Sequence, residues 1–197
     1  IEPDAWQGIY QETLRFLLKH PDEIMGLKKD IVGDLSRTVY SRQLEYNSEQ
    51  TNCLYWKASG CYRNQKFAES FILQNCIEYY RNNINTKSKQ TQDTDILSIA
   101  VHDHHPSCSS VFESKTQGYD YHIPILAVAM LIEDAFPQYV LVGGNIDRYQ
   151  AKIAQEMVKD IIGKNIALPV CVESQRLFKR LIKSFSELEA IRHFSTM

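Results

Sequence analysis

Four consecutive residues, His102, Asp103, His104 and His105, are the first candidates for chemistry in this sequence. Imidazole and carboxylate ligands together suit a divalent metal such as Zn²⁺ or Mn²⁺, and a metal-bound water can become a nucleophile near neutral pH. Adjacent residues of an extended chain point to opposite sides, so His102 pairs with His104, or Asp103 with His105. A complete site needs further ligands, and the local candidates are Glu133, Asp134, Asp147 and His122.

The string Val101-His-Asp-His-His-Pro106 resembles the DHH motif that names a phosphoesterase family, in which the motif also follows a strand. The resemblance implies that Asp103, His104 and His105 serve a metal centre. It covers this short string, and the aspartate-rich motifs that precede it in that family would fall here in a segment predicted to be helical and then polar. We therefore favour the alternative, a polar loop whose histidines are solvated or hydrogen-bonded to turns.

A second candidate is the glycine loop Gly143-Gly144-Asn145-Ile146-Asp147, which lies between a predicted strand and a predicted helix. Glycines allow close backbone approach, and a helix N-terminus offers N–H groups to an anion. The loop lacks the GxGxxG pattern and the Walker lysine of nucleotide sites. Asp147 and Gln150 have the spacing of a capping box, which would use the same N–H groups. We favour the cap, and a ligand loop at Gly143, Gly144, Asn145 and Asp147 is the alternative.

Two further groups are weaker candidates. Cys108 lies near the histidines in the sequence, and a thiolate beside a histidinium would be nucleophilic, but no protease signature surrounds it. Glu133 and Asp134 are adjacent on a predicted helix, about 100° apart around its axis, which does not suit a catalytic dyad. Carboxylates are unfavourable at a helix C-terminus, and an ion pair to Arg148 or Lys152 would explain them.

The elements that must position these groups form the C-terminal half of the chain. Apolar runs at residues 96–101, 139–142 and 167–172 predict buried strands, and residues 122–134 and 147–162 predict helices. A helical stripe begins at Ser174. This order is typical of an α/β layer. The fold class that we predict is α/β, with α+β as the alternative.

The N-terminal half is predicted to be helical. Apolar residues at helical spacing indicate helices over 4–19, from 22 to about 44, and over 62–81. Residues 82–95 are almost devoid of apolar side chains and predict a flexible linker. The expected organisation is a helical unit (1–81), a linker (82–95) and a small α/β unit with a C-terminal helix (96–197), the helical unit packed on or linked to a small sheet covered by helices.

Composition restricts the partners. The net charge of −2 and the absence of a basic stripe argue against nucleic acid as a partner. The sequence contains no run of 18 apolar residues, so we expect no membrane-spanning helix. Five cysteines without a CxxC pair favour free thiols in a reducing compartment, which predicts a cytoplasmic protein. The 11 tyrosines suit an interface, and the start at Ile1 suggests a piece of a longer polypeptide.

We therefore expect a domain with a binding, regulatory or assembly role, without catalysis and without a cofactor. Its partner would be another domain of the same polypeptide, a separate protein, or a second copy of the chain. The alternative is a metal-dependent hydrolase that acts on phosphoesters, centred on residues 102–105. A third possibility is a piece of a multidomain enzyme whose active site lies elsewhere, which predicts a broad apolar patch.

Overall fold

The computed structural model describes residues 1–20, 27–29, 35–37, 40–44, 53–61, 66–83, 95–101, 108–111, 115–116, 118–119 and 121–196. Helices predominate, beside small antiparallel sheets. The helices are α1 (Pro3–Lys19), α2 (Ile77–Asn83), α3 (Ile96–Val101), α4 (His122–Ala135), α5 (Arg148–Ile162), α6 (Ser174–Ser184) and α7 (Glu187–Phe194), with the short 3₁₀ helix η1 (Val170–Val172) before α6. The strands are β1 (Leu27–Lys29), β2 (Leu35–Arg37), β3 (Tyr40–Leu44), β4 (Cys53–Cys61) and β5 (Lys66–Gln74).

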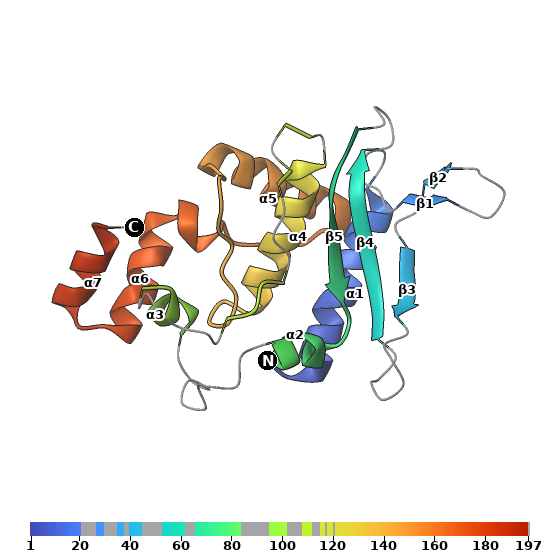
Figure 1. Cartoon of the computed structure of the whole chain (residues 1–197). Coiled ribbons are helices and arrows are strands. Elements are labelled where there is room, and N and C mark those ends of the chain that lie inside the picture. Colours follow the sequence, from blue (N-terminus) through green and yellow to red (C-terminus); the bar gives the residue numbers. More distant parts are fainter. Residues whose placement is uncertain are drawn as a thin grey trace.

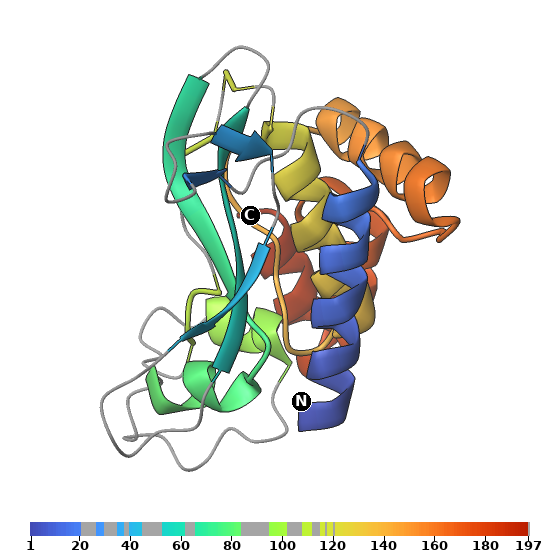
Figure 2. The same ribbon diagram turned by 90° about the vertical axis from the view of Figure 1, so that its right-hand side faces the viewer.

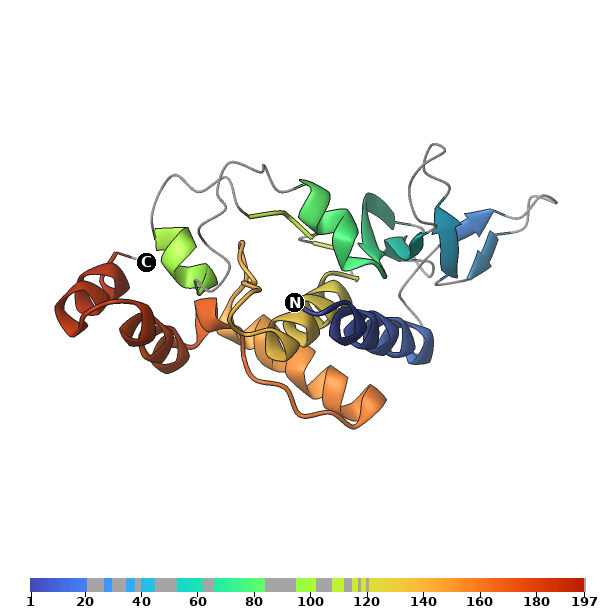
Figure 3. The same cartoon turned by 90° about the horizontal axis from the view of Figure 1, so that it is seen from below.

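The elements form layers (Figure 1). Strands β3, β4 and β5 make one antiparallel sheet in that order, and β1 pairs with β2. Figure 2 shows the sheet on one side, with α1 and α4 packed next to it and α5 beyond them. Viewed from below, α3, α6 and α7 gather at the end of the molecule that lies away from β1 and β2 (Figure 3).

Strands β4 and β5 show the two-residue alternation of a half-buried sheet. Trp56 pairs with Leu73 and Ala58 with Phe71, and all four side chains are buried, whereas Ile72 is exposed. Side chains along a strand point alternately to its two faces, so one face of β4 and β5 belongs to the core.

Two tryptophans fasten helix α1 to this sheet. The indole N–H of Trp6 donates to the carbonyl of Gln74 at 2.9 Å, and that of Trp56 donates to the hydroxyl of Thr13 at 3.0 Å. The Thr13 hydroxyl in turn donates to the carbonyl of Tyr10 at 2.8 Å. Buried indoles need such acceptors, so these contacts fix where α1 crosses the strands as well as which rings pack.

One large core spans the layers, and a smaller one lies at the far end. The large core includes Trp6, Trp56, Leu131 and Val158, so it draws on residues before 82 and after 95. The smaller core joins α3, η1, α6 and α7 through Leu97, Val170, Leu177, Leu181 and Ala190. None of the helices within the described ranges is long and apolar enough to cross a membrane.

Several predicted elements are confirmed. Helix α1 matches the prediction for 4–19, α4 matches 122–134, α5 matches 147–162, and the stripe after Ser174 forms α6 and α7. Each of the long helices α1 and α5 has a clear apolar face, and α4 is apolar on most of its surface because both the sheet side and α5 cover it.

The predicted α/β layer is wrong, because its three strands do not form. Residues 96–101 are helix α3, residues 139–142 make a turn and an irregular segment, and residues 167–172 run irregularly into η1. Short apolar runs fit a buried strand and a short buried helix equally well, and here tertiary contacts decide.

The helical prediction for the N-terminal half also fails after α1. The described residues between 22 and 44 form β1, β2 and β3, and the predicted helix 62–81 is strand β5 followed by α2. Aromatic and β-branched residues suit strands, and Phe71 and Leu73 fit a two-residue period as well as a helical one. Residues 84–94 of the predicted linker lie outside the described residues, so the division into units stays a prediction.

The Thr13–Trp56 bond gives a stability test. Thr13→Val keeps the shape of the side chain but removes the acceptor for the buried indole N–H, so we expect the free energy of unfolding to fall by about 1–3 kcal/mol. A Trp56→Phe variant lacks the indole N–H, so adding Thr13→Val to it should lower the free energy of unfolding much less. Urea denaturation of the four variants measures this cycle, and equal losses in both backgrounds would contradict the bond's role.

Candidate functional site

Two adjacent carboxylates at the end of α4 hold the backbone of two distant segments. Glu133 is 1% exposed, and its two oxygens accept the N–H groups of Val142 and Val170, each at 2.8 Å. Asp134 accepts the N–H of Ala167 at 2.9 Å. These bonds supply partners for buried backbone that would otherwise need a sheet neighbour, which explains how irregular segments replace the expected strands.

The environment of Glu133 is electrostatically mixed. Burial raises the pKa of Glu133, while the two backbone N–H groups and the charges of Arg176 and Arg180 offset part of that rise. An Arg176 guanidinium nitrogen lies 3.8 Å from the carboxylate. Because a buried charge is tolerated only with such partners, Glu133 is a structural anchor and is poorly placed to exchange protons with a substrate.

The ion pair that would link this acidic pair to Arg148 or Lys152 is not formed among the described residues. Arg148 pairs instead with Glu173 at 3.1 Å. The position of Glu133 and Asp134 near a helix C-terminus is compensated by backbone N–H groups from outside the helix.

The predicted capping box at the start of α5 is confirmed. The Asp147 side chain accepts the N–H of Gln150 at 2.7 Å, and the Gln150 side chain accepts the N–H of Asp147 at 3.2 Å. Gly144 has a φ of 116°, a conformation that favours glycine. Gly143, Gly144 and Asn145 are exposed. The cap occupies part of the helix N-terminus that an anion would use, and a ligand loop here stays a prediction.

His102, Asp103, His104 and His105 lie outside the described residues, so their role as metal ligands stays a prediction. The supporting ligands proposed for them have other partners. Glu133, Asp134 and Asp147 bind backbone N–H groups, and Nδ1 of His122 lies 2.7 Å from the Thr116 hydroxyl. Within the described ranges, no three His, Cys, Asp or Glu side chains are grouped so that they could hold a metal ion.

Two cysteines, Cys108 and Cys171, do not resemble activated nucleophiles. Burial raises the pKa of Cys108, the opposite of what nucleophilic catalysis needs. Burial and the charge of Glu133 raise the pKa of Cys171 from its ordinary 9.0 to about 11. Cys76, Cys108 and Cys171 are free thiols.

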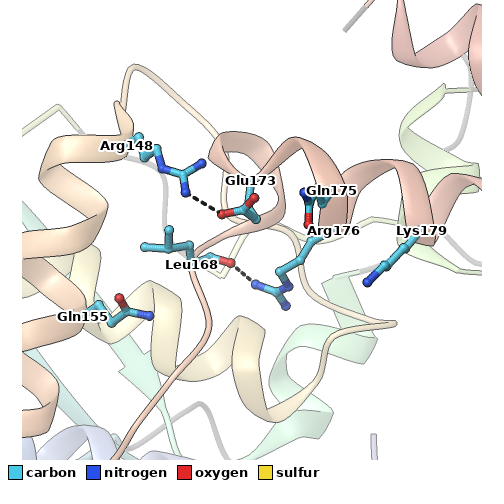
Figure 4. A pocket seen from close by; sticks show the side chains of 7 residues that line it. All are labelled: Arg148, Gln155, Leu168, Glu173, Gln175, Arg176 and Lys179. Atoms are coloured by element: carbon cyan, nitrogen blue, oxygen red, sulfur yellow. Dashed lines mark hydrogen bonds and ion pairs between the residues drawn. The ribbon is translucent and has the colours of Figure 1, made fainter.

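Sequence patterns missed a hollow that gathers several charged side chains. It has a volume of about 500 Å³, is open to solvent and lies between the N-terminal parts of α5 and α6 (Figure 4). We call it the basic hollow. Its lining consists of Arg148, Gln155, Leu168, Glu173, Gln175, Arg176 and Lys179.

The basic hollow carries three cationic groups and one anionic group. Arg148 pairs with Glu173, and Arg176 donates to the carbonyl of Leu168 (Figure 4) and also lies 3.8 Å from the Glu133 carboxylate. A guanidinium group has five N–H donors, so both arginines retain further N–H groups. Lys179 is exposed on α6. Such an arrangement can bind an anionic group.

Comparison with protein-family models, curated proteins and solved structures found no match to this chain.

Glu133 gives a second stability test. Glu133→Gln keeps one acceptor oxygen but turns an amide NH₂ toward the other backbone N–H, so we expect a loss of about 1–3 kcal/mol in the free energy of unfolding, measured in urea. Glu156→Gln, an exposed change on α5, should stay within about 0.5 kcal/mol. A Glu133→Gln variant as stable as this control would contradict the anchor.

The raised pKa of Cys171 predicts slow alkylation. With a pKa of about 11 the thiolate fraction below pH 9 is about 100-fold lower than for an ordinary thiol, so iodoacetamide should label Cys171 correspondingly slowly. The rate should keep rising up to pH 11 rather than level off near 9. Mass spectrometry measures labelling at Cys171, with the urea-unfolded chain as control. Equal rates in both states would show the shift to be absent.

Proposed function

We propose that this chain is a binding module that holds an acidic group of a protein partner, or of another domain of the same polypeptide, in the basic hollow, without catalysis. The observation that carries the proposal is the lining of the hollow, which contains three cationic side chains, Arg148, Arg176 and Lys179, and a single carboxylate, Glu173. The chain as a whole has a net charge of −2, so this positive surface is a local feature.

The chemistry of the lining favours binding of carboxylates. Guanidinium groups offer paired N–H donors that match the two oxygens of a carboxylate, and Gln155 and Gln175 add neutral amides. The Glu173 carboxylate on Arg148 already illustrates this pairing within the chain. An acidic side chain from a partner would compete with or extend that contact.

The same lining is poorly suited to hydrolysis. Its one carboxylate, Glu173, is already engaged in an ion pair with Arg148. The nearby Glu133 is buried and binds two backbone N–H groups. A recognition surface, in which charges provide orientation and selectivity, fits these side chains better than a reaction centre.

The test is binding of a fluorescent peptide rich in glutamate, measured by anisotropy, with a glutamine-for-glutamate peptide as the neutral control. We expect the acidic peptide to bind and the affinity to fall with added salt. The double variant Arg148→Gln/Lys179→Gln should weaken binding about tenfold, because it removes two cations from the hollow.

The matched control is Lys152→Gln/Lys183→Gln, which removes two exposed charges from the same two helices outside the lining of the hollow. This control should bind almost as tightly as the unmodified chain. No binding by the unmodified chain, or equal weakening in both double variants, would refute the proposed function.

A further inference from the structure

The carboxylate of Glu173 already takes the place in the basic hollow that an acidic group of a partner would need. It lies 3.1 Å from a terminal nitrogen of the Arg148 guanidinium, and the pair links the residue before α6 to the first residue of α5 (Figure 4). A carboxylate from outside would be bound by the same guanidinium donors, so it competes with Glu173 for them. Glu173 therefore has the position of an internal ligand.

Glu173 can leave Arg148 at little cost. The side chain of Arg148 is 54% exposed and that of Glu173 is 19% exposed, so water reaches the pair. Ion pairs in contact with water contribute little to stability, because water screens the charges and both side chains lose freedom when they pair. Within the described part of the chain, Arg148 is also the one partner of the Glu173 carboxylate.

The other carboxylate near these arginines is fixed in place. Glu133 lies 3.8 Å from Arg176, but it is 1% exposed and accepts two backbone N–H groups. Moving Glu133 away would leave those N–H groups buried without an acceptor, which is costly. Of the two carboxylates, Glu173 is the one that a ligand can displace.

The start of α6 offers the displaced side chain a second place. Glu173 is the N-cap residue of α6, yet its side chain makes no capping hydrogen bond. The N–H groups in the first turn of a helix lack partners within the helix, and the helix dipole favours a negative charge there. After it leaves Arg148, the Glu173 carboxylate can accept these N–H groups, so its charge keeps a favourable environment.

We propose that Glu173 regulates the basic hollow as a built-in competitor, which occupies Arg148 until an acidic group of the partner displaces it. The inference rests on the proposed function, because it requires that an acidic group binds in the hollow. It adds that this group replaces Glu173 on Arg148 instead of joining it. The exchange keeps the affinity below the value that the three cations would give if Arg148 were unoccupied.

The experiment measures binding of the fluorescent glutamate-rich peptide by anisotropy, for the unmodified chain and for Glu173→Gln. Glutamine keeps the size of the side chain but does not attract Arg148 by charge. We therefore expect the peptide to bind about fivefold more tightly, the effect of removing one competing ion pair. Glu187→Gln removes an exposed carboxylate of α7, outside the lining of the hollow, and should change the affinity by less than about twofold.

The same change in an Arg148→Gln background separates competition from a general effect of charge. In that background Glu173 has no guanidinium at position 148 to occupy, so Glu173→Gln should improve the affinity by less than about twofold. Should Glu173→Gln fail to fold by circular dichroism, Glu173→Asn, which is neutral and a favoured N-cap residue, replaces it in both backgrounds.

The outcomes distinguish the competition from the proposed function. Equal affinity of the unmodified chain and Glu173→Gln, weaker binding by Glu173→Gln, or the same gain in both backgrounds would overturn the competition. In each of these cases the peptide still binds, so the proposed function stands. Absence of binding by both the unmodified chain and Glu173→Gln would refute the proposed function and the competition together.

Discussion

The carboxylate of Glu133 determines where the two helices of the candidate site lie. One oxygen holds Val142, just before the loop that leads into α5, and the other holds Val170, at the start of η1 and just before α6. Arg148 begins α5 and Arg176 lies in the first turn of α6, so a single buried side chain sets the relative position of the cations in the basic hollow. Asp134 adds a third tie at Ala167. The Glu133 carboxylate satisfies two buried backbone N–H groups, as hydrogen bonds between neighbouring strands do in a sheet.

The other half of the structure depends on how α1 is fixed to the sheet. The indoles of Trp6 and Trp56 bind Gln74 and Thr13, so each large ring is held by a polar contact as well as by packing. Helix α4 then packs against α1 and α5, and its C-terminal end presents Glu133 and Asp134 to the segments that follow. Packing in the core therefore positions α4, and Glu133 at the end of α4 positions the segments that carry the basic hollow.

Local patterns predicted the parts of this fold that local interactions stabilise. The capping box of Asp147 and Gln150 spans three residues, and the long amphipathic helices show their period directly. Residues 139–142 and 167–172 do not form the predicted strands. The N–H groups of Val142 and Val170 bind the side chain of Glu133, 9 and 37 residues away, and that of Ala167 binds Asp134. The spacing of apolar residues along a segment does not indicate a hydrogen bond to a side chain so far away in the sequence. The histidine cluster drew attention by composition, and it lies outside the described residues.

The basic hollow was missed because its residues come from separate stretches of the chain and match no motif. A weak signal was present in the sequence. Arg148 and Arg176 stand in the first turns of α5 and α6, where the helix dipole disfavours a cation, and Asp147 and Glu173 precede them. Local patterns do not show that α5 and α6 lie side by side, because their positions depend on the long-range hydrogen bonds of Glu133.

Amide hydrogen exchange of Val142 and Val170, followed by NMR, tests this account most directly. Both N–H groups should exchange slowly in the unmodified chain and much faster in Glu133→Gln, while the N–H of Gln150, held by Asp147, should not change. Fast exchange of Val142 and Val170 in the unmodified chain, or equal rates in the variant, would show that Glu133 does not organise the segments that carry the basic hollow.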